Sequence, residues 1–218
     1  MNRIRSTNEE CRQELHPDRQ KTTAMISSKK TKTRSRLRVA LFGAGPIACD
    51  SHVQTLKRYP GVFRCIAVWA KQQKSAKFLV NKQFSDDTSR GSQPKIYSGE
   101  DGLKEIFDSS GVEAVIIALP LDVQHIYVRK ALLRGKHVLS ENPIATTLSK
   151  AQKLVDCYQK LVLPSSCPAV WFVAENYRYH PAILRAAQVV QKDIGYVRLL
   201  ENSIHSASFN QCIWNCQH

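Results

Sequence analysis

The sequence predicts an α/β fold built on a doubly wound parallel sheet. From about Leu37 to about Asn176, short apolar runs alternate with helical patterns, and this alternation is typical of parallel strands joined by crossover helices. A glycine-rich turn directly follows the first apolar run. The hydrophobic fraction of 43% is ordinary for a globular chain, and the 218 residues allow one full domain and part of another.

The first strand, helix and second strand surround a G-x-G-x-x-A sequence at residues 43–48. A strand is predicted over residues 37–42, a helix to about Arg58, and a second strand over residues 63–69. In this context the motif is typical of dinucleotide binding. The first glycine permits the tight turn, the second lets backbone amides approach a pyrophosphate, and the alanine lets the helix pack closely on the strand. The helix N-terminus presents unpaired N–H groups to the phosphates. We therefore expect a Rossmann domain that binds NADP(H) or NAD(H).

The rest of the chain repeats the same alternation. Helices are predicted over residues 75–84, 103–109, 122–134, 148–161 and 182–191, and strands over residues 93–97, 112–119, 137–139, 169–174 and 196–204. Pro120 ends the most apolar strand, and Gly135 caps the helix that follows it.

The second strand suggests which dinucleotide is preferred. In NAD-specific domains an acidic residue at the end of this strand accepts hydrogen bonds from the ribose 2′-hydroxyl. Here the strand runs into Ala70-Lys71-Gln72-Gln73-Lys74, which has no carboxylate. Lys71 and Lys74 could instead meet a 2′-phosphate as point charges. The sequence therefore favours NADP(H) over NAD(H), and the alternative is that both lysines are simply solvated.

The formal net charge of +14 is concentrated in the leader. Residues 1–38 hold eleven Lys/Arg and four Asp/Glu, a net charge of +7, so half of the excess lies there. We interpret residues 1–36 as a disordered basic leader and expect no specific nucleic-acid binding. A cytoplasmic location is favoured, with an organelle transit peptide or a nuclear-import patch as alternatives. Met25 is a second candidate start.

The seven cysteines are interpreted as free thiols in a reducing compartment, because their number is odd and no C-x-x-C pair occurs. Cys49 and Cys65 lie in apolar segments and are expected to be small core residues. Cys212, Cys216 and His218 fit no common zinc spacing, so no metal site is predicted. No run of 18 apolar residues is present, and no membrane span is expected.

Several segments in order resemble the Gfo/Idh/MocA (glucose–fructose oxidoreductase / inositol dehydrogenase) family. They are residues 39–45, Ala118-Leu119-Pro120 with His125 beyond, residues 131–139 running into Glu141-Asn142-Pro143, and residues 176–181. The resemblance covers roughly residues 37–205. It implies a two-domain oxidoreductase that moves a hydride between a nicotinamide and a sugar, polyol or related carbonyl compound.

The motif and the resemblance together give the candidate cofactor-binding residues. These are Gly43, Ala44, Gly45, Pro46, Ile47, Lys71, Leu119, Pro120, His125, Glu141, Asn142 and Pro143. The family usually has Glu-Lys-Pro at residues 141–143, and its lysine lies beside the nicotinamide. Asn142 can donate a hydrogen bond there, but it is neutral and does not titrate in the useful range. No catalytic residue is assigned.

The expected domains are a leader at residues 1–36, the Rossmann domain at residues 37–180 and the truncated start of the C-terminal substrate domain at residues 181–218. In the family, the general acid/base lies in that second domain, and His205 does not sit in the family's context for it. We therefore expect the chain as given to bind cofactor without useful turnover, and a homo-oligomer only if the C-terminal sheet were complete. The alternatives are a noncatalytic NADP-binding regulator and an inactive truncated product.

Overall fold

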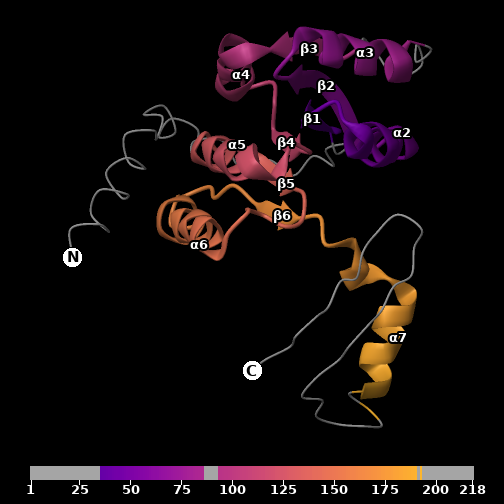
Figure 1. Cartoon of the computed structure of the whole chain (residues 1–218), viewed down its shortest axis with the longest axis vertical. Coiled ribbons are helices and arrows are strands. Elements are labelled where there is room, and N and C mark those ends of the chain that lie inside the picture. The colour runs from indigo at the N-terminus through magenta and orange to yellow at the C-terminus, as the bar shows by residue number, and fades with distance from the viewer. Residues whose placement is uncertain (1–34, 86–92, 191, 193–218) are drawn as a thin grey trace, which may run out of the picture. The chain divides into compact units, whose positions relative to one another are not determined.

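The computed structural model describes residues 35–85, 93–190 and 192. These residues divide into two units, one ending at Ala174 and one beginning at Glu175. The first unit holds a six-stranded sheet in the order β3-β2-β1-β4-β5-β6 (Figure 1), and each pair of neighbouring strands is parallel. The strands are β1 (Leu37–Phe42), β2 (Phe63–Ala70), β3 (Lys95–Ser98), β4 (Ala114–Ile117), β5 (His137–Ser140) and β6 (Trp171–Val173). This is the predicted doubly wound sheet.

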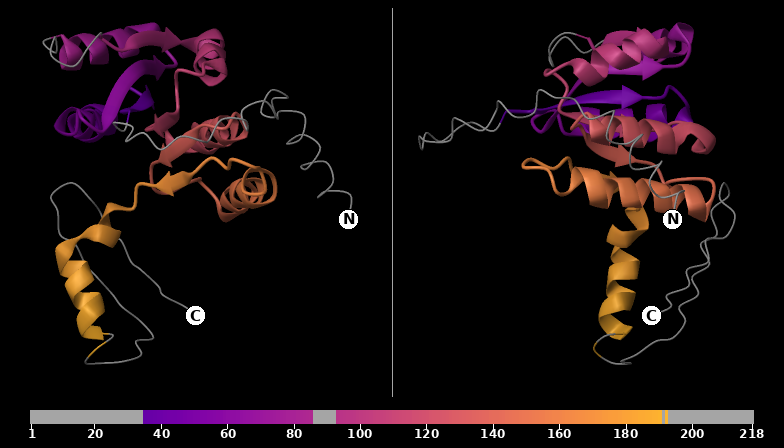
Figure 2. Two further views of the ribbon diagram at one scale, coloured as in Figure 1. Left: turned by 180° about the vertical axis from the view of Figure 1, so that it is seen from behind. Right: turned by 90° about the vertical axis from the view of Figure 1, so that its left-hand side faces the viewer.

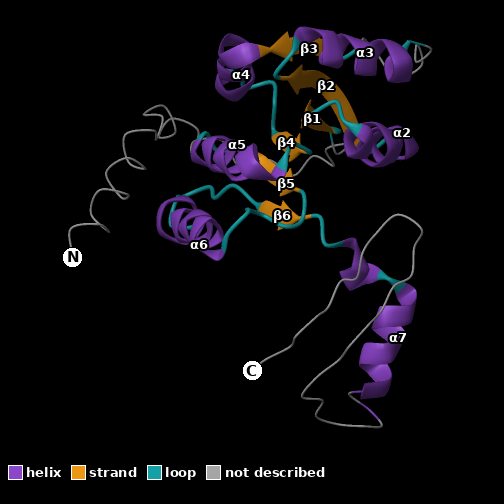
Figure 3. Cartoon of the chain, in the orientation of Figure 1, coloured by secondary structure: helices purple, strands orange, loops and turns teal. Residues whose placement is uncertain are grey.

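The crossover segments between the strands are helical (Figure 3). They are the π-helical turn η2 (Ala48–His52) continuing into α2 (Val53–Arg58), then α3 (Gln73–Phe84), α4 (Gly99–Asp108), α5 (Leu121–Leu133), and α6 (Leu148–Cys157) continuing into the π-helical turn η4 (Tyr158–Val162). Helices α2 and α3 lie on one face of the sheet, and α4, α5 and α6 on the other (Figures 1 and 2).

Each helical layer encloses its own core, because alternate residues of the strands point to opposite faces. Leu41 and Val68 are fully buried with Ala48 and Leu79 under α2 and α3. On the other face, Phe42 packs its ring 5.3 Å from Trp69 and 5.6 Å from Phe107, under α4 and α5. Strands β1 and β2 are thus covered on both faces, which explains the continuous apolar runs at residues 39–42 and 65–70.

Within the described residues the predicted elements are present, with shifted ends. Helix α4 begins at Gly99 rather than at residue 103, since its first turn holds the polar Glu100 and Asp101, which suit a helix N-terminus. Strand β4 covers only residues 114–117 of the predicted 112–119, because pairing with β1 and β5 ends there. The predicted helix over residues 148–161 is in two parts, α6 and η4.

The second unit contains the short 3₁₀ helix η5 (Asn176–Tyr179) and α7 (Pro181–Val189), which begins with a proline in its first turn. Helix α7 corresponds to the helix expected over residues 182–191. The strand expected over residues 196–204, His205, the basic leader and the Cys212–His218 segment all lie outside the described residues.

Candidate functional site

The carboxyl ends of β1 and β4 meet at the point where the strand order reverses. Ligands of open α/β sheets bind at this topological switch point, outside the carboxyl ends of the strands. The predicted cofactor residues follow the carboxyl ends of four strands: residues 43–47 follow β1, Lys71 follows β2, Leu119 and Pro120 follow β4, and residues 141–143 follow β5. The sheet therefore gathers segments far apart in sequence along one edge; His125 comes from the helix after β4.

Gly43 is fixed by the sheet rather than by a ligand. Its φ of 114° is one that L side chains rarely adopt, and a Cβ built on it would lie 2.2 Å from the carbonyl oxygen of Ala118. Its N–H donates to the carbonyl of Trp69 at 2.8 Å. The glycine thus permits the turn to leave β1 tightly against the end of β4, as the motif predicts.

Gly45 has the opposite character. Its φ is ordinary, and a Cβ built on it would meet no protein atom within 4 Å. Gly45, Pro46 and Ile47 are exposed, and Ile47 is 50% exposed although it is a large apolar residue. Ala48, immediately after them, is completely buried against the sheet. The loop thus offers an open, partly apolar surface at the start of a helix.

The end of β2 carries the candidate residues for cofactor preference. Lys71 and Lys74 are both exposed, on either side of the start of α3. Ala70, the last residue of β2, is only 5% exposed and packs in the same cluster as Ala48. Neither residue 70 nor residues 71–74 supply a carboxylate, so the described end of β2 presents positive charge at this edge.

The segment after β5 is held from two sides. The amide nitrogen of Gln124, on α5, donates to the carbonyl oxygens of Glu141 and Pro143, both at 2.9 Å. The side chain of Glu141 contacts His52 of η2, with 2.5 Å between Oε1 and Nε2. Asn142, between these anchored residues, is exposed, and the Asn142–Pro143 peptide is cis. Asn142 is thus presented outward by a braced loop.

His125 lies one residue beyond Gln124 and is partly buried. Burial, and then the positive charge of Lys150, lower the pKa of its imidazole, while Asp122 acts in the opposite direction. Its Nδ1 is buried without a hydrogen-bond partner among the described residues, as is Oε1 of Gln124. A lowered pKa keeps this imidazole neutral near pH 7.

His52 and Gln124 were not among the predicted site residues. Gln124 is a polar residue on the buried side of α5 and is only 1% exposed. His52 is only 8% exposed. The contact with Glu141 joins residues 89 positions apart, and local spacing carries no information about such a pair.

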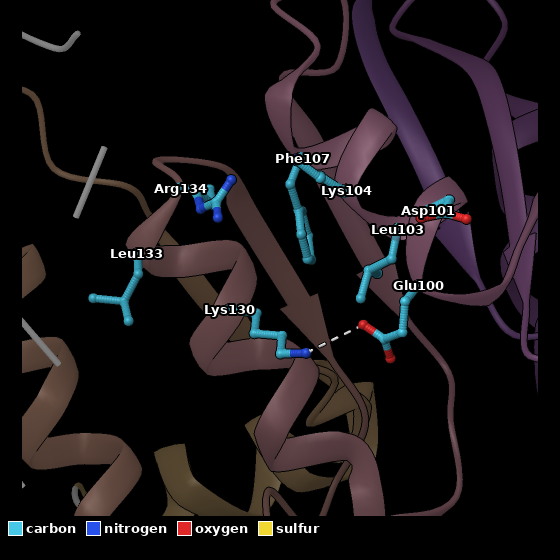
Figure 4. A pocket seen from close by; sticks show the side chains of 8 residues that line it. All are labelled: Glu100, Asp101, Leu103, Lys104, Phe107, Lys130, Leu133 and Arg134. Atoms are coloured by element: carbon cyan, nitrogen blue, oxygen red, sulfur yellow. Dashed lines mark ion pairs between the residues drawn. The ribbon is translucent and has the colours of Figure 1, made fainter. Parts of the chain in front are cut away.

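A hollow of 310 Å³ lies elsewhere, between α4 and α5 (Figure 4). Phe107 points into it, and Lys130 and Glu100 form an ion pair across it at 3.6 Å. Arg134 pairs with Asp108 at its rim. These two ion pairs link α4 to α5. None of the predicted cofactor residues lines the hollow.

No group of three or more His, Cys, Asp or Glu side chains is arranged to hold a metal ion within residues 35–85, 93–190 and 192. Over the same residues, no helix combines the length and apolar character needed to cross a bilayer. The described cysteines, Cys49, Cys65, Cys157 and Cys167, are free thiols. Cys49 and Cys65 are partly buried and pack against the core under α2 and α3.

Comparison with known proteins agrees with this geometry. Residues 37–164 match the GFO_IDH_MocA family model, described as an oxidoreductase family with an NAD-binding Rossmann fold. Dehydrogenase FPY6 of Fusarium mangiferae is 34% identical over 157 residues, which are 72% of this chain and 43% of that protein. A dTDP-3,4-didehydro-2,6-dideoxy-alpha-D-glucose 3-reductase of Streptomyces antibioticus is 31% identical over 123 residues, 55% of this chain and 33% of that protein.

Among solved structures, an oxidoreductase from Thermotoga maritima superposes with a TM-score of 0.62 at 25% identity, covering 74% of this chain and 45% of that one. The chain thus spans less than half the length of each of these three proteins.

Proposed function

Because the chain belongs to the GFO_IDH_MocA family of oxidoreductases, whose fold binds NAD, we propose that the carboxyl edge of its sheet binds NADP(H). In the whole protein, this site serves hydride transfer to or from a sugar, a polyol or a related carbonyl compound. The observation that carries the binding proposal is the open space at Gly45, beside a helix start at the topological switch point.

The pyrophosphate half of the site is formed by residues 43–48. A phosphate at this position needs backbone N–H groups within hydrogen-bonding distance, and a side chain at Gly45 would stand in that space. Among the residues that the structure describes, no atom uses the space, since none lies within 4 Å of a Cβ built there. The absence of a packing reason for this glycine supports a ligand as the reason.

The proposed preference for NADP(H) rests on charge. Lys71 is exposed directly after β2, where NAD-specific domains have an acid. A lysine attracts a 2′-phosphate, whereas a carboxylate would repel it. Hydrogen bonds to charged groups contribute about 1.5–3 kcal/mol, so removing Lys71 should weaken NADP binding about tenfold or more and leave NAD binding nearly unchanged.

The nicotinamide half is proposed to lie against residues 119–120 and 141–143. The nicotinamide ring supplies or accepts the hydride when the cofactor is bound. Asn142 is exposed and its amide can donate a hydrogen bond to a substrate oxygen, but it cannot accept the proton of a hydroxyl at neutral pH. Asn142 is therefore proposed to orient and polarise the substrate, and the proton must go to another group.

The proposed substrate class, a sugar, a polyol or a related carbonyl compound, is supported by the relatives. The Streptomyces antibioticus protein is named as a reductase of a nucleotide-linked sugar. Residues 141–143 lie within the family match and within the part of this chain that the structure describes. The domain limits proposed for the chain remain residues 37–180 for the Rossmann domain and residues 181–218 for the start of the substrate domain.

The experiment is calorimetric titration of the full chain with NADPH and with NADH. Gly45→Val should abolish binding of both, because its side chain enters the pyrophosphate space. Gly61→Val is the matched control, since Gly61 is exposed in the loop before β2 and also has no protein atom within 4 Å of a built Cβ. Equal binding by the parent and Gly45→Val would refute the site.

Turnover is tested separately, by following NADPH oxidation or NADP reduction over a panel of aldoses, polyols and small carbonyl compounds. Binding with turnover supports the oxidoreductase proposal in the chain itself. Binding without turnover on any member of the panel would instead favour the alternative of a noncatalytic NADP-binding regulator.

A further inference from the structure

We propose that His52 is a positioning residue: through Glu141 it sets the loop of residues 141–143 against the nicotinamide half of the cofactor. The inference rests on the proposed function, because it assumes that a nicotinamide dinucleotide occupies the carboxyl edge. It adds a residue that neither the glycine motif nor the Glu-Asn-Pro segment contains.

The geometry of the helix start brings His52 to this place. The turn η2 is π-helical, with the N–H of Val53 donating to the carbonyl of Ala48, five residues back. A π turn holds one more residue than an α-helical turn, and such turns are frequent at functional sites. His52 ends this turn, and its side chain is only 10% exposed.

The contact joins the two halves of the site. Nε2 of His52 lies 2.5 Å from Oε1 of Glu141, a carboxylate that is 22% exposed. Glu141 also donates its N–H to the carbonyl of Ile117 at 3.3 Å and accepts from Gln124 at its own carbonyl. The helix that follows the pyrophosphate loop is therefore connected by a side-chain hydrogen bond to the loop that presents Asn142.

A purely structural role does not explain this pair well. Replacing both partners of a buried hydrogen bond by apolar groups of the same shape can be nearly neutral or stabilising, so holding η2 next to the loop after β5 does not require an imidazole and a carboxylate. A directional hydrogen bond instead fixes one position of the loop. Since Asn142 is exposed next to the anchored Glu141, the pair determines where that amide points.

The test separates the two halves of the cofactor with two probes. Adenosine 2′,5′-bisphosphate samples only the adenosine half, and NADPH samples both, with its nicotinamide fluorescence reporting on the ring. In His52→Ala we expect NADPH affinity to fall about tenfold, as for loss of a charged hydrogen bond, and the fluorescence change on binding to disappear. Affinity for the bisphosphate should change less than about twofold.

Two further variants address the hydrogen bond. His52→Gln retains a hydrogen-bond donor and should recover much of the NADPH affinity. Glu141→Ala should show the same losses as His52→Ala, and it replaces His52→Ala in the test if His52→Ala does not fold. The matched control is His137→Ala. His137 is a partly buried histidine at the first residue of β5, away from the carboxyl edge, and its Nδ1 accepts from the N–H of Val170 at 2.9 Å. It should leave both affinities unchanged.

Unchanged NADPH binding and fluorescence in His52→Ala and Glu141→Ala would overturn the inference while leaving the proposed function intact. An equal loss for both probes would also overturn it, since it would place the effect at the pyrophosphate loop. If the parent chain binds neither probe, the proposed function itself fails, and the inference with it.

Discussion

The two glycines of the motif predict opposite consequences for the same substitution. Gly43→Ala places a methyl group 2.2 Å from the carbonyl oxygen of Ala118 and forces alanine to a φ of 114°. Gly45→Ala meets no protein atom within 4 Å, and its backbone is already in an ordinary conformation. The first change should therefore reduce the stability of the fold, and the second should reduce only the binding of the cofactor.

The expected size follows from two contributions. A residue held in a sparsely populated backbone region costs about 1–3 kcal/mol, and forcing an extra methyl group into a packed position costs about 1–3 kcal/mol. Their sum of about 2–6 kcal/mol is a large part of the roughly 5–15 kcal/mol that stabilises a typical domain. At about 2–4 °C per kcal/mol, Tm should fall by roughly 5–20 °C.

The assay is thermal unfolding of the parent, Gly43→Ala and Gly45→Ala chains without cofactor, followed by circular dichroism. Gly45→Ala should melt with the parent or slightly above it, because replacing glycine at a compatible position stabilises by about 0.4–1 kcal/mol. NADPH should then raise Tm of the parent but raise Tm of Gly45→Ala less, since bound ligand stabilises the native state in proportion to its affinity.

If Gly43→Ala melts within about 2 °C of the parent, less than the shift expected from 1 kcal/mol, the inferred contact with Ala118 is wrong. If Gly45→Ala loses as much stability as Gly43→Ala, the distinction between a packing glycine and a ligand glycine is wrong. Both results are independent of which dinucleotide binds.

Three further predictions follow. Lys71→Ala should lower the NADP/NAD affinity ratio about tenfold or more, measured by calorimetry, whereas Lys77→Ala, an exposed lysine one turn into α3, should not change it. Burial raises the pKa of Cys65 to about 12, so alkylation with mass spectrometry should modify the exposed Cys167 well before Cys65; early labelling of Cys65 would contradict its burial. Because the pKa of His125 is lowered in the folded state, the unfolded chain binds more protons below about pH 6.5, and the stability of the fold should fall as the pH is lowered through that range. The Tm of His125→Gln should therefore depend less on pH there than the Tm of the parent. The same dependence of Tm on pH in both chains would contradict the lowered pKa of His125.

The sheet could be predicted from sequence because each strand is determined by a local run. Residues 39–42 and 65–70 are apolar throughout because both faces of the strands are covered there, and Arg38, Gly43, Arg64 and Lys71 bound these runs. The ends were less predictable. β4 stops at Ile117 although the apolar run continues to Leu119, because the limit is set by pairing with β1 and β5 rather than by composition.

The site could be predicted where the motif is local and not where it is formed by long-range contacts. The strand–turn–helix pattern predicts Gly43 and Gly45 as site residues. Only the structure shows that Gly43 is packed against Ala118 while the space at Gly45 is open. Gln124 and His52 act on residues 17 and 89 positions away. Hydrophobic periodicity is a local pattern, so it carries no information about hydrogen bonds between residues this far apart in sequence.

These long-range contacts change how Asn142 should be understood. A neutral residue at the family's lysine position could indicate a loop that is no longer maintained for function. The structure instead holds this loop with two hydrogen bonds from Gln124 and one contact from His52. Burying a polar group costs free energy unless the group is hydrogen-bonded. A loop without a role would therefore be anchored at lower cost in free energy by apolar packing. The bracing of residues 141–143 therefore argues that Asn142 is presented to a ligand, whether or not that ligand is reduced or oxidised there.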